Sequence, residues 1–283
     1  SIAQTVNTLF FMGVAQQKGR GIYKLEGTQP TYISNAVIDR ILNADDLATV
    51  YSFCIRISGH NFYILTLSTS NITLAYDDAT GDWKEWTSLT AGTVLSSVTL
   101  AYADYIVTAT KAAHGLSDGA VVTIAGASPA AYNGNFIINY IDSSHFSYVP
   151  ASVPASTPAT GSITATPYTE GKFIGRNYTG FGVWDLVQDV SGNLYSVSTD
   201  STDDNGVPIS VLIRTKLLDG QNNKFKYFTQ AQIIGDRVSE VASVRYTNDD
   251  YQSWSAYRQV DLSLARPQVY RLGRARRRAF ELK

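Results

Sequence analysis

The stretch "NFYILTLSTSNITLAYDD" (residues 61–78) contains an apolar run, a polar hairpin and a shorter run with a tyrosine. Two further stretches share this layout, "TLFFMGVAQQKGRGIYKL" (8–25) and "GFGVWDLVQDVSGNLYSV" (180–197). One spacing of 11 residues recurs in all three, between Met12 and Tyr23, Leu65 and Tyr76, and Trp184 and Tyr195. A repeated strand–hairpin–strand unit predicts a chain that is built from similar antiparallel sheets.

The distances between these repeats predict β-propeller blades. Tyr23 and Tyr76 are 53 residues apart, and Tyr76 and Tyr195 are 119 residues apart. The second interval contains a stretch of different composition at 91–166, and without its 76 residues the interval is 43. Propeller blades recur at about 40–50 residues and have four short strands. The predicted fold class is all-β, with a partial or open β-propeller, and we expect further blades outside this chain. Unrelated β-meanders are the alternative.

Four segments follow from this pattern. Residues 1–90 are predicted to form propeller blades, and 167–207 to continue them. Residues 91–166 contain strand-like runs separated by turn clusters, which predicts an inserted small β-barrel or sandwich domain. From 208 to 283 longer strands joined by polar turns predict a C-terminal β-sandwich-like module.

Composition excludes several kinds of site. Aromatic residues make up 12% of the chain, with 18 Tyr, which favours strands. Cys54 is the single cysteine, and the three histidines are far apart, so we expect no disulfide, no metal site and no cofactor. The longest apolar run near the start, "TLFFMGVA" (8–15), is too short to cross a bilayer. We therefore expect a soluble protein of a reducing compartment, without membrane insertion.

The acidic and Asp-rich turns do not form a convincing active site. "YDDATGDWKEW" (76–86) brings together carboxylates of the kind that glycosidases use, but it fits a tight blade turn more simply. "DSTDDNG" (200–206) lacks the spacing of a calcium loop. "TNDDYQSW" (247–254) partly fits the Asp-box turn of sialidase propellers, with Tyr251 where that turn has Gly. We predict that the protein is not an enzyme.

The chain closes with "RLGRARRRAF" (271–280), in which five of ten residues are Arg. Residues 266–283 carry a net charge of +6, and the remainder of the chain sums to −7. Read as one strand, this segment places alternate residues on opposite faces. Ion pairing within the chain or between subunits, a solvated strand and DNA contact are the three interpretations. The candidate pairing residues are Arg274, Arg276, Arg277 and Arg278.

Several stretches resemble one family of phage proteins. They are "KGRGIYKLEGTQPTYIS" (18–34), "GHNFYILTLSTSNITLAYDDATGDWKEW" (59–86), "DDNGVPISVLIRTKLL" (203–218), "SVRYTNDDYQSWS" (243–255) and "RLGRARRRAFEL" (271–282). Together they resemble the tail hub or nozzle proteins of short-tailed phages, also called packaged-DNA stabilisation proteins. The segment "AAHGLSDGAVVTIAGASPAAYNGNF" (112–136) resembles a small β-domain that recurs in phage structural proteins.

The resemblance implies a structural virion protein of the phage tail that assembles in the cytoplasm of the host bacterium. It implies a hexameric ring below the portal and its adaptor, whose channel retains packaged double-stranded DNA and conducts it non-specifically during ejection. The implied partners are other copies of the chain, the portal adaptor, and tail spikes, fibres or a needle. Two alternatives remain at this point: a carbohydrate-binding or sialidase-like propeller that acts on host-surface glycans, and a DNA-binding protein that uses the Arg-rich end.

Overall fold

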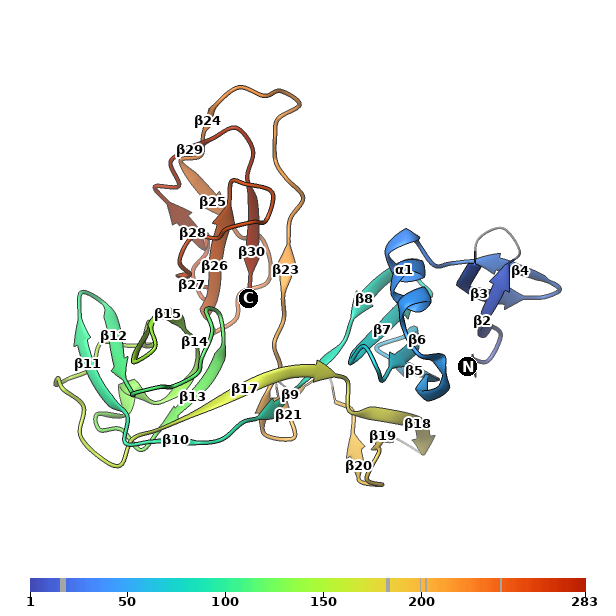
Figure 1. The fold of residues 1–283 in the computed structure, drawn as a ribbon, viewed down its shortest axis with the longest axis horizontal. Coiled ribbons are helices and arrows are strands. Elements are labelled where there is room, and N and C mark those ends of the chain that lie inside the picture. Colours follow the sequence, from blue (N-terminus) through green and yellow to red (C-terminus); the bar gives the residue numbers. More distant parts are fainter. Residues whose placement is uncertain (16–18, 182–183, 199, 202, 240) are drawn as a thin grey trace. The chain divides into compact units, whose positions relative to one another are not determined.

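The computed structural model of the chain describes residues 1–15, 19–181, 184–198, 200–201, 203–239 and 241–283. These residues form short β-strands in several antiparallel sheets, and they contain a single α-helix (Figure 1). The predicted all-β class is confirmed. The chain divides into two compact units: unit 1 contains residues 1–90 and 170–209, and unit 2 contains residues 91–169 and 210–283. The four-domain division stays a prediction, because compactness does not show which segment folds alone.

Unit 1 consists mainly of three sheets of consecutive strands. The first has the order β1(Ile2–Gln4), β2(Leu9–Ala15), β3(Gly19–Glu26) and β4(Gln29–Tyr32). The second has the order β5(Tyr51–Ile57), β6(His60–Leu67), β7(Ile72–Asp77) and β8(Asp82–Glu85). The third has the order β18(Gly175–Phe181), β19(Trp184–Asp189) and β20(Leu194–Ser196). Three short elements complete the unit: η1(Leu47–Thr49), β21(Asp203–Asp204) and β22(Val207–Pro208).

The second sheet is buried on both faces because its side chains alternate between two hydrophobic clusters. Along β6, Tyr63 and Leu65 pack with Phe10 and Ile22 of the first sheet, whereas Ile64 packs with Val187 of the third sheet. Burial on both faces explains why this strand is almost continuously apolar. The three sheets therefore stack face to face in chain order.

The helix α1(Ala36–Ala44) covers the junction of the first two sheets. Asn35 caps its first turn, since the Asn35 side chain accepts hydrogen bonds from the backbone N–H groups of Val37 and Ile38. Ile38 and Leu42 are buried in the cluster that the first two sheets share. The helix thus stabilises the packing of one sheet on the next.

The repeats found in the sequence occupy equivalent places in the three sheets. In each sheet, the two runs of the repeat form the second and third strands, which are β2 and β3, β6 and β7, and β19 and β20. Four-stranded antiparallel sheets that stack face to face are the architecture of propeller blades. The repeat prediction is confirmed for all three stretches, although the turn residues 16–18 and residues 182–183 lie outside the described residues.

The first part of unit 2 contains two sheets that enclose one core. One has the order β10(Leu95–Ser96), β17(Thr164–Lys172), β13(Val121–Ala125) and β14(Gly134–Ile137). The strand β9(Thr87–Ala91), which spans the boundary between the two units in the chain, also pairs with β17. The other has the order β11(Thr99–Ala103), β12(Ile106–Thr110), β16(His145–Tyr148) and β15(Asn139–Asp142). The turn η2(Ala130–Tyr132) inserts Tyr132 into the shared core, where its ring is fully buried.

The C-terminal part of unit 2 has shorter strands than the sequence predicts. Its main sheet has the order β23(Ile213–Arg214), β30(Ala279–Leu282), β26(Val241–Thr247) and β27(Arg258–Asp261). Two further pairs are β24(Lys226–Tyr227) with β29(Arg274–Ala275), and β25(Gln230–Gln232) with β28(Gln268–Tyr270).

Polar contacts join this C-terminal sheet to the two sheets before it. Arg245 Nη1 lies 3.0 Å from Asp118 Oδ2, and the Tyr257 N–H donates to Asn139 Oδ1 at 2.9 Å. The two parts therefore meet through specific contacts within one unit.

Candidate functional site

The Arg-rich segment is not one continuous strand. Gly273 turns the chain in the left-handed region at φ +72°, after which β29 ends at Ala275 and β30 begins at Ala279. Residues 276 and 277 form a bend between the two strands. The prediction that the side chains of residues 274–282 alternate between the two faces of one strand is therefore wrong. Arg276 and Arg277 are both exposed, and Arg278 is buried.

Arg278 lies in the interior, where its side chain is 1% exposed. The guanidinium carbon lies 4.5 Å from the ring centre of Phe228 and 4.1 Å from that of Tyr246. Nε donates to Asn248 Oδ1 at 2.9 Å, whereas Nη1 is buried without a partner among the described residues. Burial lowers the pKa of Arg278 below its ordinary value. Arg278 is thus a packing residue between two aromatic rings.

We expect Arg278→Met to change the free energy of unfolding by less than about 1 kcal/mol, and Arg278→Ala to lower it by about 2–4 kcal/mol. Met keeps an unbranched stem between the rings and removes a buried charge, whereas Ala leaves a cavity. Urea unfolding of both variants measures the difference. Equal losses in the two variants would show that the charge, rather than the stem, stabilises the fold.

A buried carboxylate lies next to this segment. Glu281 is fully buried, and its Oε2 lies 2.6 Å from Arg214 Nε while its Oε1 lies 2.6 Å from Arg245 Nε. The Tyr257 hydroxyl also donates to Oε1 at 2.6 Å. Burial alone would raise the pKa of Glu281, but the hydrogen bonds from Tyr257 and the two arginines bring it below its ordinary value. The closing strand is therefore fixed to β23 and β26 by a charged network.

Arg277 forms an ion pair with Asp250 in the turn that follows β26. The same turn is ordered by Asp249, whose Oδ1 accepts from the Ser253 N–H at 2.9 Å and from Thr247 Oγ1 at 2.7 Å. Hydrogen bonds from Ser253 and Thr247 lower the pKa of Asp249 to about 2. Tyr251 adopts the left-handed region, with φ +67°, at the place where an Asp box has Gly. The "TNDDYQSW" stretch is a structural turn.

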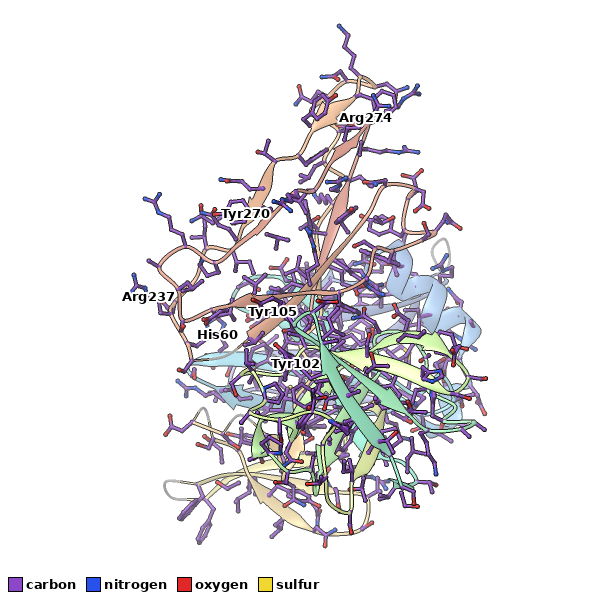
Figure 2. The ribbon with its side chains drawn as sticks, turned by 90° about the vertical axis from the view of Figure 1, so that its left-hand side faces the viewer. His60, Tyr102, Tyr105, Arg237, Tyr270 and Arg274 are labelled. Atoms are coloured by element: carbon purple, nitrogen blue, oxygen red, sulfur yellow. The ribbon has the colours of Figure 1, made fainter. Side chains whose placement is uncertain are left out.

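Arg274 and Arg276 lie against one exposed aromatic ring. Their guanidinium carbons lie 5.1 and 5.0 Å from the ring centre of Phe225, which is 56% exposed. In the described part of the chain, no carboxylate pairs with either arginine. Figure 2 shows Arg274 at the outer end of the C-terminal strands, with Tyr270 farther back along them. We call Arg274 and Arg276 the arginine pair, and Phe225 the ring that they share.

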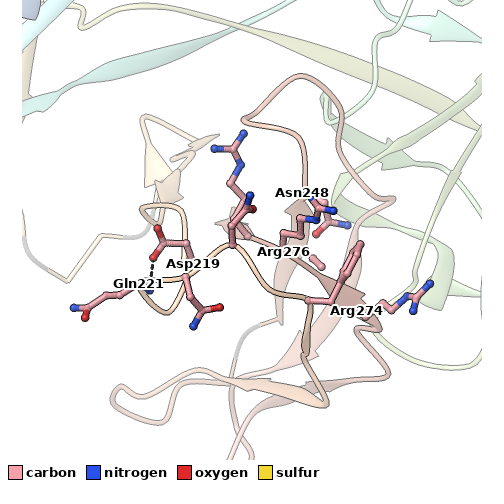
Figure 3. Close-up of a pocket in the computed structure, with 10 residues that line it drawn as sticks. Asp219, Gln221, Asn248, Arg274 and Arg276 are labelled. Atoms are coloured by element: carbon pink, nitrogen blue, oxygen red, sulfur yellow. Dashed lines mark hydrogen bonds between the residues drawn. The ribbon is translucent and has the colours of Figure 1, made fainter.

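The arginine pair borders a hollow of about 740 Å³ (Figure 3). Besides Arg277, its polar lining comes largely from Asp219, Gln221, Asn222, Asn223 and Asn248. Sequence reasoning identified the arginines but missed Phe225 and Asn248, which lie far from them along the chain. A Phe in a polar turn, "DGQNNKFK" (219–226), is the one local signal that could have drawn attention to it.

Asp77, a candidate residue of unit 1, has a structural role. Asp77 is 1% exposed and is engaged by His60 Nδ1 at 3.0 Å and by the Ala79 N–H at 3.0 Å. Gly81 turns the chain at φ +75°, so "YDDATGDWKEW" forms the hairpin between β7 and β8. Over the described residues, no group of three His, Cys, Asp or Glu side chains is placed to hold a metal ion. The same residues include no helix that is long and apolar enough to cross a membrane.

Comparison with known proteins gives one family match. Residues 1–106 match the family model described as "Bacteriophage P22 Gp10, beta-propeller". No curated protein matches the chain. Among solved structures, the phage phi92 endosialidase is similar with 11% identity and a TM-score of 0.25. The match covers 71% of this chain and 39% of the endosialidase chain, and likeness at this level carries no argument.

The family match and the geometry of unit 1 agree. The matched residues contain the first two of the three stacked sheets, and the matched description names a β-propeller. This confirms the resemblance that the sequence predicts, whereas the match does not extend over most of the inserted segment. Residues 1–106 are thus similar to the family described as "Bacteriophage P22 Gp10, beta-propeller".

Proposed function

We propose that this chain is a non-enzymatic structural protein of a phage tail, in which copies form a ring-shaped hub or nozzle below the portal and its adaptor. The ring seals packaged double-stranded DNA and conducts it during ejection. It assembles in the host cytoplasm and holds spikes, fibres or a needle. The observation that carries the proposal is the Gp10 family match of residues 1–106, over sheets that stack as propeller blades.

Two features of the chain support a structural role. Stacked sheets give a rigid body, because the inner strands are paired on both sides and the sheet faces are buried against the neighbouring sheets. One carboxylate that a sialidase-like propeller could use is engaged otherwise, since Asp77 is buried and paired with His60. No observation in the described residues favours the glycan-binding alternative.

Native mass measurement and electron microscopy of the full chain, alone and with portal and adaptor, test the proposal. We expect six-fold rings, at least when the portal and adaptor are present. A chain that stays monomeric with both partners would contradict the hub. Glycan-array binding and fluorogenic glycoside turnover test the alternative: turnover that Asp77→Asn or Asp82→Asn abolishes would replace the structural function by an enzymatic one.

A further inference from the structure

The two units carry opposite charges. Unit 1 contains 14 Asp and Glu against 8 Lys and Arg, a net charge of −6. Unit 2 contains 10 Asp and Glu against 15 Lys and Arg, a net charge of +5. Opposite charges attract and like charges repel, so two copies of the chain favour contacts between unit 1 of one copy and unit 2 of the next. Contacts of this head-to-tail kind are the ones that close a ring.

The arginine pair is held in place before any partner binds. β24 pairs with β29, so Tyr227 lies opposite Arg274. Lys226 Nζ donates to the carbonyl oxygens of Asn222, Lys224 and Arg276 at 2.8, 2.9 and 2.8 Å. This ammonium therefore fixes the Phe225 turn beside the bend of the Arg-rich segment. Preorganised donors lose little conformational entropy when a partner binds.

The hollow beside the pair presents further donors. Because Asn248 Oδ1 accepts from Arg278 Nε, the Nδ2 group of that amide remains available as a donor. The nearby Asp219 Oδ1 is turned to the N–H of Gln221, at 2.8 Å (Figure 3). Guanidinium groups and amide N–H groups are the donors that bind carboxylates, in bidentate fashion where Arg is involved. The site therefore has the chemistry of a carboxylate receptor.

One Asp–Asp pair of unit 1 lies in a short, largely exposed hairpin. Unit 1 contains three Asp–Asp pairs, at 45–46, 77–78 and 203–204. Asp45 is buried and accepts from Ser70, and Asp77 and Asp78 are paired with His60 and Lys24. In the described residues, the 203–204 pair has no Lys or Arg partner. Asp203 is exposed at the start of the β21–β22 hairpin and accepts from the Gly206 N–H at 2.8 Å, whereas Asp204 is half-buried and accepts from Ser88 Oγ at 2.9 Å.

We infer that Arg274 and Arg276, with Phe225 beneath their guanidinium groups, bind the carboxylates of the Asp203–Pro208 hairpin in a second copy of this chain. This inference rests on the proposed ring and names the contact that closes it. The basic surface here is small, because Asp219 lies on the wall of the hollow and Arg277 is already paired with Asp250. Duplex DNA needs a continuous basic track for its phosphates, so a small acidic hairpin fits two guanidinium groups better.

The main experiment compares ring assembly of full-length variants with portal and adaptor. Arg274→Gln with Arg276→Gln is expected to raise the concentration for half-assembly by about tenfold or more, and Asp203→Asn with Asp204→Asn to do the same. The matched control is Arg237→Gln with Arg271→Gln, which removes the same charge from two exposed arginines and should leave assembly unchanged. Reversed charges test the pairing itself: R274E/R276E combined with D203K/D204K should restore rings that either half alone abolishes.

A second measurement does not require a ring. The peptide of residues 203–208 is titrated into full-length chain while the arginine Nε–H resonances are followed by NMR. We expect saturable shifts that R274Q/R276Q abolishes. If the peptide binds but the wild-type chain forms no ring, the proposed hub function is wrong and the proposed contact stands. Three results would each overturn the contact. The first is ring assembly that R274Q/R276Q leaves unchanged, and the second is the absence of any response to the peptide. The third is salt-sensitive binding of duplex DNA that depends on Arg274 and Arg276, while D203N/D204N assembles normally.

Discussion

Glu281→Gln is expected to lower the free energy of unfolding of unit 2 by about 3 kcal/mol or more. The carboxylate is fully buried, and the guanidinium groups of Arg214 and Arg245 lie 2.6 Å from its two oxygens. The amide has nearly the same volume and can still accept from Tyr257, so the loss reports the missing charge. Removing one member of a buried ion pair leaves the other charge without compensation. Here both guanidinium groups lose the charge of Glu281, and only Arg245 keeps another carboxylate partner, Asp118.

Hydrogen exchange and urea unfolding measure this loss. We expect faster exchange in β30, which contains Glu281, and in β26, which pairs with it. The matched control is Asp236→Asn, an exposed carboxylate of the same unit, and it should change the free energy of unfolding by less than about 0.5 kcal/mol. Equal unfolding midpoints for Glu281→Gln and wild type would show that desolvation of the charges cancels their attraction.

The pH dependence of stability follows from the same carboxylate. Since the folded-state pKa of Glu281 lies below its ordinary value of 4.5, the unfolded chain binds this proton more readily than the folded chain. The stabilisation is present above that ordinary value and is lost as pH falls through the lower folded-state pKa. The unfolding midpoint of wild type should therefore drop on acidification through this range, and Glu281→Gln should reduce the drop. An unchanged drop would assign it to other carboxylates.

The blades could be predicted from the sequence because their contacts are local. In each repeat, hairpin neighbours are close along the chain, and a period of two or a continuous apolar run shows which faces are buried. β6 illustrates this, since its apolar residues supply two clusters on opposite faces of one sheet. The match of residues 1–106 to a β-propeller family confirms the interpretation at the level of the fold.

The arginine site could be predicted only in part because its contacts are distant along the chain. Leu218 bridges to Arg278, and this pairing together with the bend before it breaks the alternation that the sequence pattern predicts. The ring of Phe225 meets Arg274 across about fifty residues, and no local spacing encodes that contact. Burial of Arg278 likewise depends on Phe228, which lies between β24 and β25, and on Tyr246 of β26. Charge composition identified the segment but not the separate environment of each arginine.

Phe10→Ala is expected to lower the free energy of unfolding of unit 1 by about 3–5 kcal/mol. Phe10 is fully buried, and its ring stacks on Tyr63 with centroids 4.9 Å apart and meets the edge of Tyr76 at 6.1 Å. Phe10 comes from the first sheet and the two tyrosines from the second. The substitution therefore leaves a cavity between two blades, where rigid aromatic neighbours cannot collapse to fill it.

The matched control for this variant is Val14→Ala on the same strand. The Val14 side chain is 79% exposed, so the substitution should change the free energy of unfolding by less than about 0.5 kcal/mol. Because the cluster around Phe10 consists of unit 1 residues alone, hydrogen exchange should accelerate in β2, β6 and β7. A loss confined to β2 would contradict shared blade packing, since the first sheet would then open without its neighbour. A loss that spreads through both sheets shows that the blades fold as one cooperative body.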